Sequence, residues 1–292
     1  MTKILVTGGK GQLGQSFQSI TSQYENIEAI FTDVEELDIC NIENITEYLT
    51  NTDIKYIINC AAYTAVDKAE TDQTASTRLN ATAVKNIGKA AKEHGIKVIH
   101  ISTDYVFDGN SHKPYNESDY AVPASFYGQT KLLGEKYLME EQPDSIIIRT
   151  AWLYSEFGNN FVKTMIKLGN ERDELRVVAD QIGSPTYAVD LAESILDIIS
   201  KIENNSVKFV AGIYHYSNEG VCSWYDFTIN IHQMMGIECR VMPIESKEYP
   251  TAAPRPYYSV LNKTKIKTTY KLNVPYWRIS LENCLRKLAV KN

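Results

Sequence analysis

The sequence lacks the features of a secreted, membrane-spanning or zinc-bound protein. Its five cysteines are odd in number and widely scattered, and no C-x-x-C pair occurs among Cys40, Cys60, Cys222, Cys239 and Cys284. Neither a disulfide framework nor a metal site is therefore expected. No apolar run approaches the ~18 residues of a spanning helix, and the N-terminal apolar run is too short for a signal peptide. We expect a cytoplasmic protein with reduced thiols and no membrane partner.

Blocks of basic residues are missing as well. Lys and Arg number 30 against 36 Asp and Glu, which gives a net charge of −6. Nucleic-acid-binding proteins normally carry a basic patch or stripe, so we expect no nucleic-acid partner. The hydrophobic content of 43% is ordinary for a globular protein. A chain of 292 residues suffices for one large α/β unit or for a main domain with a smaller one.

A glycine-rich loop follows the first predicted strand, residues 3–7. Gly8, Gly11 and Gly14 are spaced three apart and lead into a helical pattern. In dinucleotide-binding folds such glycines turn the chain, let the backbone approach a pyrophosphate and let the helix pack on the sheet. We predict a cofactor site at these glycines and at Gln12 and Leu13. A glycine turn without a ligand is the alternative, and a P-loop is excluded because no Ser or Thr follows Lys10.

The second predicted strand, residues 27–31, leads to Asp33, about twenty positions beyond the glycine loop. An acidic residue there suits a ribose 2′-hydroxyl and hence NADH, whereas Lys10 could meet the 2′-phosphate of NADPH. The choice between the two cofactors stays open. Asp38 and Ile39 lie where a second loop could cover the adenine, although Asp38 could equally cap the next turn.

Two further predicted strands, 55–62 and 97–101, should bring more polar groups to the same end of the sheet. The first ends in small residues, and we assign Ala62, Tyr63 and Thr64 to the cofactor site. A helix is predicted over 75–94, closing at Gly95. Asn80 within it is as consistent with a structural role as with a cofactor contact.

Tyr127 is the only tyrosine with a lysine, Lys131, four positions later. Residues four apart share a helix face, and a nearby ammonium favours the phenolate, so the pair can exchange protons. Ser125 is a plausible N-cap of this helix. Thr103, after the strand 97–101, can hydrogen-bond a substrate carbonyl. On this pattern alone, a solvated helix face is an equally good interpretation.

In this order and spacing, the glycine loop, Thr103 and the Tyr127/Lys131 pair resemble the extended short-chain dehydrogenase/reductase family. The segments STDYVFDG (102–109), TAVD (64–67) and RTAWLY (149–154) are similar to its dTDP-4-dehydrorhamnose reductases. The similarity continues through GNNF (158–161), DQIGSPT (180–186), WYD (224–226) and Arg255-Pro256, and covers essentially the whole chain. It implies a Rossmann-type doubly wound parallel sheet with a smaller C-terminal α/β substrate lobe. We expect residues 1–150, with parts of 175–205, in the cofactor domain and 151–292 mainly in the lobe.

The resemblance also implies a reaction. The C4 ketone of dTDP-4-dehydro-L-rhamnose would be reduced to dTDP-L-rhamnose with hydride from NADPH or NADH. Tyr127 would protonate the oxygen, Lys131 would lower the pKa of Tyr127 and hold the nicotinamide ribose, and Thr103 would hydrogen-bond the same oxygen. These three are the expected catalytic residues.

The substrate contacts expected from the resemblance are Thr103, Asp104, Tyr127, Trp152 and Arg255. Asp104 and Trp152 would line the sugar, and Arg255 would meet the diphosphate. A core position for Trp152 and a surface ion pair for Arg255 are the alternatives. Dehydratases of the family follow the threonine with Asp-Glu, whereas here Tyr105 follows Asp104, which leaves elimination chemistry without an obvious acid.

Some reductases of the family dimerise through a metal held by two glutamates. The corresponding positions here are Ser16 and Val189, so we expect no metal site and a monomer or weak homodimer without a metal bridge. Two other functions remain open. One is a reductase or epimerase of another nucleotide deoxysugar. The other is a non-catalytic, cofactor-binding regulatory subunit, as known for a partner of methionine adenosyltransferase.

Overall fold

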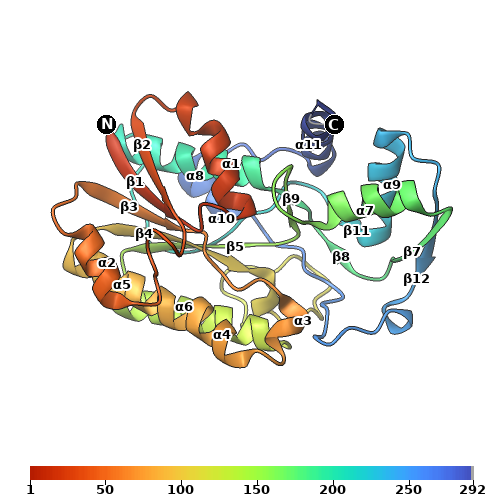
Figure 1. Cartoon of the computed structure of the whole chain (residues 1–292), viewed down its shortest axis with the longest axis horizontal. Coiled ribbons are helices and arrows are strands. Elements are labelled where there is room, and N and C mark those ends of the chain that lie inside the picture. Colours follow the sequence, from red (N-terminus) through yellow and green to blue (C-terminus); the bar gives the residue numbers. More distant parts are fainter. Residues whose placement is uncertain (291–292) are drawn as a thin grey trace.

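The computed structural model describes residues 1–290 and is built around a six-stranded sheet (Figure 1). The strand order is β10-β5-β4-β3-β1-β2, and each neighbouring pair is parallel. The bounds are β1 (Thr2–Thr7), β2 (Ile27–Thr32), β3 (Ile54–Asn59), β4 (Lys97–Thr103), β5 (Ser145–Thr150) and β10 (Gly212–His215). The direction in which successive strands are added to the sheet reverses between β1 and β3. Open α/β sheets bind ligands at the carboxyl ends of the strands beside such a reversal. The predicted doubly wound fold is confirmed.

Helices cover both faces of this sheet because its strands are apolar on both sides. Within β1, Ile4 and Val6 belong to one hydrophobic cluster and Leu5 to another, as the two-residue period of a strand requires. The first cluster contains α1 (Gln12–Ile20) and α8 (Ala188–Glu203), and the second contains α2 (Ile42–Leu49), α5 (Ala83–Glu93) and α6 (Phe126–Glu141). Figure 1 shows the two helix layers on opposite sides of the sheet.

The helix predicted over 75–94 is present but interrupted. It consists of α4 (Gln73–Thr77), a π-helical turn at Arg78–Thr82 and α5. Gly134 of α6 packs against this turn so closely that an added Cβ would collide with the carbonyl oxygen of Asn80. The extra residue of the π turn thus lies at the contact between two helices, and turns of this kind occur frequently at functional sites.

The second half of the chain forms small two-stranded pairs and further helices. β6 (Leu153–Tyr154) pairs with β9 (Thr186–Tyr187), β7 (Glu174–Val178) with β12 (Arg240–Ile244), and β8 (Ile182–Gly183) with β11 (Cys222–Ser223). The helices are α7 (Phe161–Glu171), α9 (Trp224–Met235), α10 (Thr264–Tyr270) and α11 (Trp277–Val290), and the short α3 (Val66–Ala69) belongs to the first half. In Figure 1, α7, α9, β7 and β12 lie beyond the end of the large sheet.

One strand boundary differs from prediction at an informative place. The strand predicted over 55–62 ends at Asn59, and residues from Cys60 onward leave the sheet as a loop. β10 comes from the second half of the chain and forms an edge of the large sheet, and α8 from the same half packs on that sheet. Among residues 1–290, no helix is both long enough and apolar enough to span a membrane.

Candidate active site

A cavity of about 1050 Å³ lies at the carboxyl ends of β1, β3, β4 and β5. Its walls contain all but one of the residues predicted to bind cofactor or substrate. The predicted residues that line it are Gly8, Gly11, Gln12, Leu13, Gly14, Asp33, Asp38, Ile39, Ala62, Tyr63, Thr64, Thr103, Asp104, Tyr127, Lys131 and Trp152. The chain segments that carry them are far apart in the sequence, and the parallel sheet brings them together.

The glycine loop is compact because side chains are missing from it. Gly8 has a φ of +69°, and a Cβ there would lie 2.7 Å from the backbone nitrogen of Ala61. A Cβ on Gly14 would lie 2.7 Å from Cα of Gly9 and would collide with the carbonyl oxygen of Gly8. The N-terminus of α1 therefore approaches the sheet edge closely and faces the cavity with backbone. Such a cradle suits a pyrophosphate.

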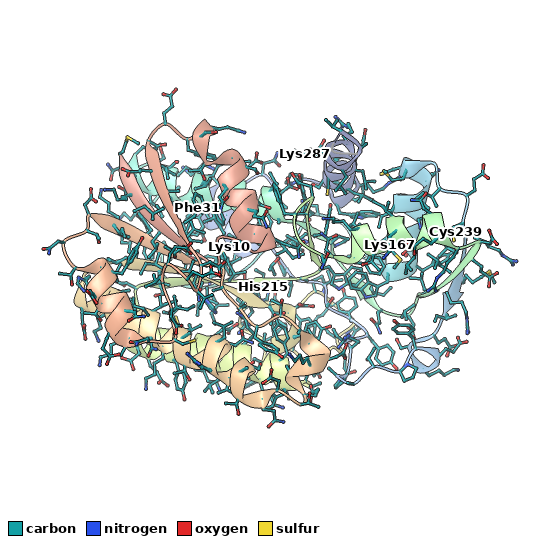
Figure 2. All side chains as sticks on the ribbon, viewed as in Figure 1. Lys10, Phe31, Lys167, His215, Cys239 and Lys287 are labelled. Carbon is teal, nitrogen blue, oxygen red and sulfur yellow. The ribbon has the colours of Figure 1, made fainter. Side chains whose placement is uncertain are left out.

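The end of the cavity near Asp33 contains two cations, each paired with a carboxylate. Lys10, at the loop between β1 and α1 in Figure 2, pairs its ammonium with Glu35 and donates its backbone N–H to Asp33 at 3.0 Å. Arg78 pairs with Asp38 at 3.3 Å. Glu35 and Arg78 were not predicted, since they have no fixed spacing from the glycine loop. Both cations are available to a 2′-phosphate only if their carboxylate partners give way.

For Asp38 and Asn80 the sequence allowed either a structural role or a cofactor contact, and both make hydrogen bonds within the protein. Asp38 accepts the backbone N–H of Cys40 at 2.9 Å, but the N-cap of α2 is Asn41. Asn80 is fully buried and binds both backbone groups of Tyr63, with its Oδ1 accepting at 2.8 Å and its Nδ2 donating at 3.0 Å. Asn80 therefore holds the Tyr63 segment at the cavity wall.

Tyr127 lies in the first turn of α6, buried beside the Thr103–Tyr105 segment. The Oγ of Ser125 accepts the backbone N–H of Gly128 at 3.2 Å, which confirms the predicted N-cap. A Cβ on Gly128 would collide with the carbonyl oxygen of Tyr105, and the rings of Tyr105 and Tyr127 meet edge to face at 5.6 Å. Close backbone packing thus fixes Tyr127 beside Thr103.

Burial controls the proton affinities of this pair. Burial raises the pKa of Tyr127, while the Thr103 side chain acts in the opposite direction. Burial also lowers the pKa of Lys131 to about 8, against the attraction of Glu135. Nζ of Lys131 donates to the carbonyl oxygen of Ile101 at 2.7 Å. Lys131 is not among the groups that shift the pKa of Tyr127, so the expected lowering by the lysine is not seen, and desolvation of the phenol keeps Tyr127 protonated.

Asp104 lies buried next to Thr103 in the cavity wall. Its Oδ1 accepts the Thr103 hydroxyl at 3.0 Å. The hydroxyl of Ser259 acts on the same carboxyl and lowers its pKa, but within residues 1–290 neither Oδ2 of Asp104 nor Oγ of Ser259 makes a hydrogen bond of good geometry. Burial raises the pKa of Asp104 to about 7. A carboxyl with one free buried oxygen is suited to a polar group that enters the cavity.

Trp152 lines the cavity and also packs against two clusters of the hydrophobic core, and its backbone is unusual. Its φ of +49° lies in the left-handed region, which non-glycine residues seldom adopt. The indole stacks on that of Trp224 with centroids 3.5 Å apart, and Phe161 packs on Trp224 at 4.5 Å. At Gly183 a Cβ would lie 2.5 Å from the Trp152 ring. Trp224 and Phe161 also line the cavity and were not predicted as site residues.

Arg255 differs from the other predicted residues. It does not line the cavity within the described chain, and its guanidinium pairs with Asp67 at 2.5 Å and donates to the carbonyl oxygen of Ala253 at 3.3 Å. This is the ion pair named above as the alternative. Ser16 and Val189 are buried, and in residues 1–290 no three His, Cys, Asp or Glu side chains gather as a metal site.

Comparison with known proteins agrees with this geometry. Residues 1–290 match the family described as RmlD substrate binding domain. The chain is 40% identical to a dTDP-4-dehydrorhamnose reductase of Aggregatibacter actinomycetemcomitans, over 97% of this chain and 98% of that one. The chain belongs to the RmlD family. The family resemblance inferred from the sequence is thereby confirmed.

Solved structures of RmlD-family proteins have the same fold. A dTDP-4-dehydrorhamnose reductase from Clostridium acetobutylicum superposes with a TM-score of 0.92 at 43% identity, covering 99% of this chain and 100% of that one. One from Bacillus anthracis, solved in complex with NADP, has a TM-score of 0.90 at 37% identity, covering 98% and 99%. This RmlD-family chain therefore has the same architecture over 98–99% of its length.

Proposed function

We propose that this chain is an NAD(P)H-dependent reductase that converts dTDP-4-dehydro-L-rhamnose to dTDP-L-rhamnose. The observation that carries the proposal is that Thr103, Tyr127 and Lys131 line the same cavity as the glycine loop. Full-length similarity to dTDP-4-dehydrorhamnose reductases supports the same substrate.

The glycine loop fits a dinucleotide, because side chains at Gly8 or Gly14 would fill the space beside the backbone. Bound NADPH or NADH would supply the hydride that reduces the ketone. Asp33, Asp38 and Ile39 would hold the adenosine end, and the segment 62–64 would border the nicotinamide end; all six residues line the cavity. The pair formed by Lys10 and Glu35 leaves both cofactors as candidates.

Tyr127 would donate its proton to the oxygen that forms at C4 of the sugar. Burial raises its pKa, so the hydroxyl is protonated and ready to donate at neutral pH. Thr103 would donate a hydrogen bond to the same oxygen once its hydroxyl proton turns away from Asp104 Oδ1. Lys131 carries its charge below about pH 8 and would bind the ribose hydroxyls and stabilise the phenolate that Tyr127 becomes. Asp104 would accept a sugar hydroxyl at its free Oδ2.

The second half of the chain would supply the sugar contacts, in keeping with a substrate lobe built mainly from residues 151–292. Trp152, Trp224 and Phe161 come from this half and form one aromatic wall. Stacked rings suit the apolar faces of a deoxysugar. Arg255 would reach the diphosphate only after leaving Asp67.

The test is consumption of NADPH and NADH with enzymatically prepared dTDP-4-dehydro-L-rhamnose, followed by the absorbance of the reduced nicotinamide. Tyr127→Phe should lower kcat by roughly 10²- to 10⁴-fold, because it removes the proton donor. Tyr137→Phe makes the same change on the same helix outside the cavity lining and should leave the rate unchanged. If folded protein binds cofactor but consumes none, the regulatory-subunit interpretation takes its place. Turnover of a different deoxysugar, identified from its product, would reassign the substrate.

A further inference from the structure

A line of four buried polar side chains runs behind the cavity, across the sheet. Thr7 Oγ1 lies 2.7 Å from Asn59 Oδ1, Asn59 Nδ2 lies 3.0 Å from His100 Nδ1, and His100 Nε2 lies 3.4 Å from Lys131 Nζ. All four residues are at most 2% exposed. Register pairs Thr7 of β1 with Asn59 of β3, and Asn59 with His100 of β4. The line is therefore a product of strand register and ends at the predicted catalytic lysine.

Donor and acceptor chemistry restricts how this line can be protonated. A charged lysine has three N–H donors and no acceptor. One of them goes to the carbonyl oxygen of Ile101, so the nearby His100 Nε2 must accept another. Burial holds the pKa of His100 well below its usual value, so the ring is neutral and its proton must then be on Nδ1. The proton on Nδ1 needs an acceptor, and Asn59 is the residue beside it.

Asn59 can meet this demand because an amide has an acceptor at one end and donors at the other. With Oδ1 toward His100 and Nδ2 toward Thr7, every group in the line is satisfied while Lys131 is charged. The structure has Nδ2 toward His100 and Oδ1 toward Thr7. In that orientation the ring carries its proton on Nε2, which faces a charged ammonium donor to donor, so a charged lysine requires the two ends of the Asn59 amide to be exchanged. The orientation of Asn59 therefore selects the charge state that the lysine can adopt.

We propose that His100 is a positioning residue for Lys131, held as its Nδ1-protonated tautomer by an Asn59 amide whose Oδ1 turns from Thr7 to the ring. Two N–H groups of Lys131 are then anchored by Ile101 and His100, and the third faces the cavity, where the lysine is one of the lining residues. Thr7 also lines the cavity next to Gly8, so the line connects the lysine to the glycine loop. This inference rests on the proposed reductase function for its catalytic consequence alone.

Other charged groups near the lysine do not replace this role. Glu135, one turn further along α6, attracts Lys131 but is held by Arg149 at 2.7 Å. Cys60, after β3, also faces the lysine, and burial raises the pKa of its thiol, so it is neutral. Tyr127 precedes the lysine on the same face of α6 and is protonated as well. His100 is thus the neutral acceptor that can support the ammonium without cancelling its charge.

The kinetic test compares His100→Leu with His100→Gln, whose amide oxygen can replace the Nε2 acceptor. Loss of a hydrogen bond to a charged group should lower kcat about 10- to 100-fold in His100→Leu. The high-pH limb of its rate profile should move down by about one pH unit, because Lys131 loses its proton more easily. In His100→Gln, most of the kcat and most of the wild-type position of the high-pH limb should be kept. His232→Leu removes an equally buried ring that bonds the carbonyl oxygen of Met165 in the other half, and should leave the limb in place.

A second test does not depend on turnover. In protein with ¹⁵N-labelled histidine, the ring signals of His100, assigned by their loss in His100→Gln, should show a protonated Nδ1 and an unprotonated Nε2 near neutral pH. Asn59→Leu should remove this preference. An Nε2-protonated ring in the wild type, or an unmoved pH limb in folded His100→Leu, would overturn the inference. If the proposed substrate is not turned over, the ring signals still decide the tautomer, so the two failures can be told apart.

Discussion

Replacing Asp104 by asparagine should make the stability of the protein less dependent on pH. Burial raises the pKa of this carboxyl from 3.8 to about 7, so the folded protein keeps a proton that the unfolded chain has already released. The stability due to this proton is present below the unfolded pKa and is lost as the pH rises through the folded one. Asparagine resembles the protonated carboxyl in shape and does not titrate.

The size of the effect follows from the same shift. Each pKa unit corresponds to about 1.36 kcal/mol, and integration from about pH 5 to about pH 8 gives a loss of roughly 2–3 kcal/mol in the wild type. At about 2 °C per kcal/mol for a chain of this size, the Tm of Asp104→Asn should gain about 5 °C relative to the wild type over this interval. Any constant effect of the new amide cancels in this double difference.

Thermal melts of both proteins at the two pH values measure this gain. Asp108→Asn is the matched control, because the hydroxyl of Tyr115 lowers the pKa of Asp108, and this carboxyl is charged in folded and unfolded protein throughout the interval. The Tm difference between Asp108→Asn and the wild type should be the same at both pH values. A pH-independent Tm difference for Asp104→Asn would show that Asp104 is ionised in the folded protein at both pH values, and the argument from burial would be wrong.

Three further predictions concern other walls of the cavity. Gly183→Ala should displace the Trp152 ring, because the new Cβ would lie 2.5 Å from it. The KM for the sugar substrate should rise roughly ten-fold or more. The Kd for the cofactor, measured by fluorescence titration, should not change. Glu35→Gln should free Lys10 and shift the ratio of Kd values toward NADPH by about two- to five-fold, and an unchanged ratio would contradict this. Between about pH 8 and 10.5 the unfolded chain holds a proton on Lys131 that the folded protein has lost, so the stability of the wild type should rise with pH. Lys131→Met should abolish this rise, which thermal melts across that range will measure.

Local spacing was sufficient to predict much of the site. Gly8, Gly11 and Gly14 stand in a fixed pattern, and Tyr127 and Lys131 are one helical turn apart. The doubly wound sheet was predictable for a similar reason, since buried parallel strands are short apolar runs. Trp152 required the family resemblance, because its left-handed backbone and its stacking on Trp224 depend on contacts between distant segments.

The parts that could not be predicted depend on register and burial. His100 and Asn59 are 41 positions apart and meet only because β3 and β4 pair at those residues. The raised pKa of Asp104 comes from desolvation, which no sequence pattern records. The pairing of Arg255 with Asp67 likewise joins residues 188 positions apart. Long-range pairs of this kind set the electrostatics of the cavity.

The late arrival of β10 has a consequence for synthesis of the chain. β10 pairs with β5, where Ile146, Ile147 and Ile148 are fully buried. Roughly 60 residues separate the two strands, so at about 5–20 residues per second the ribosome needs roughly 3–12 seconds to deliver the partner. During that interval β5 is an apolar edge open to pairing with another nascent chain. A translational pause before Gly212 would lengthen this exposure and increase aggregation, while the finished enzyme would be unchanged.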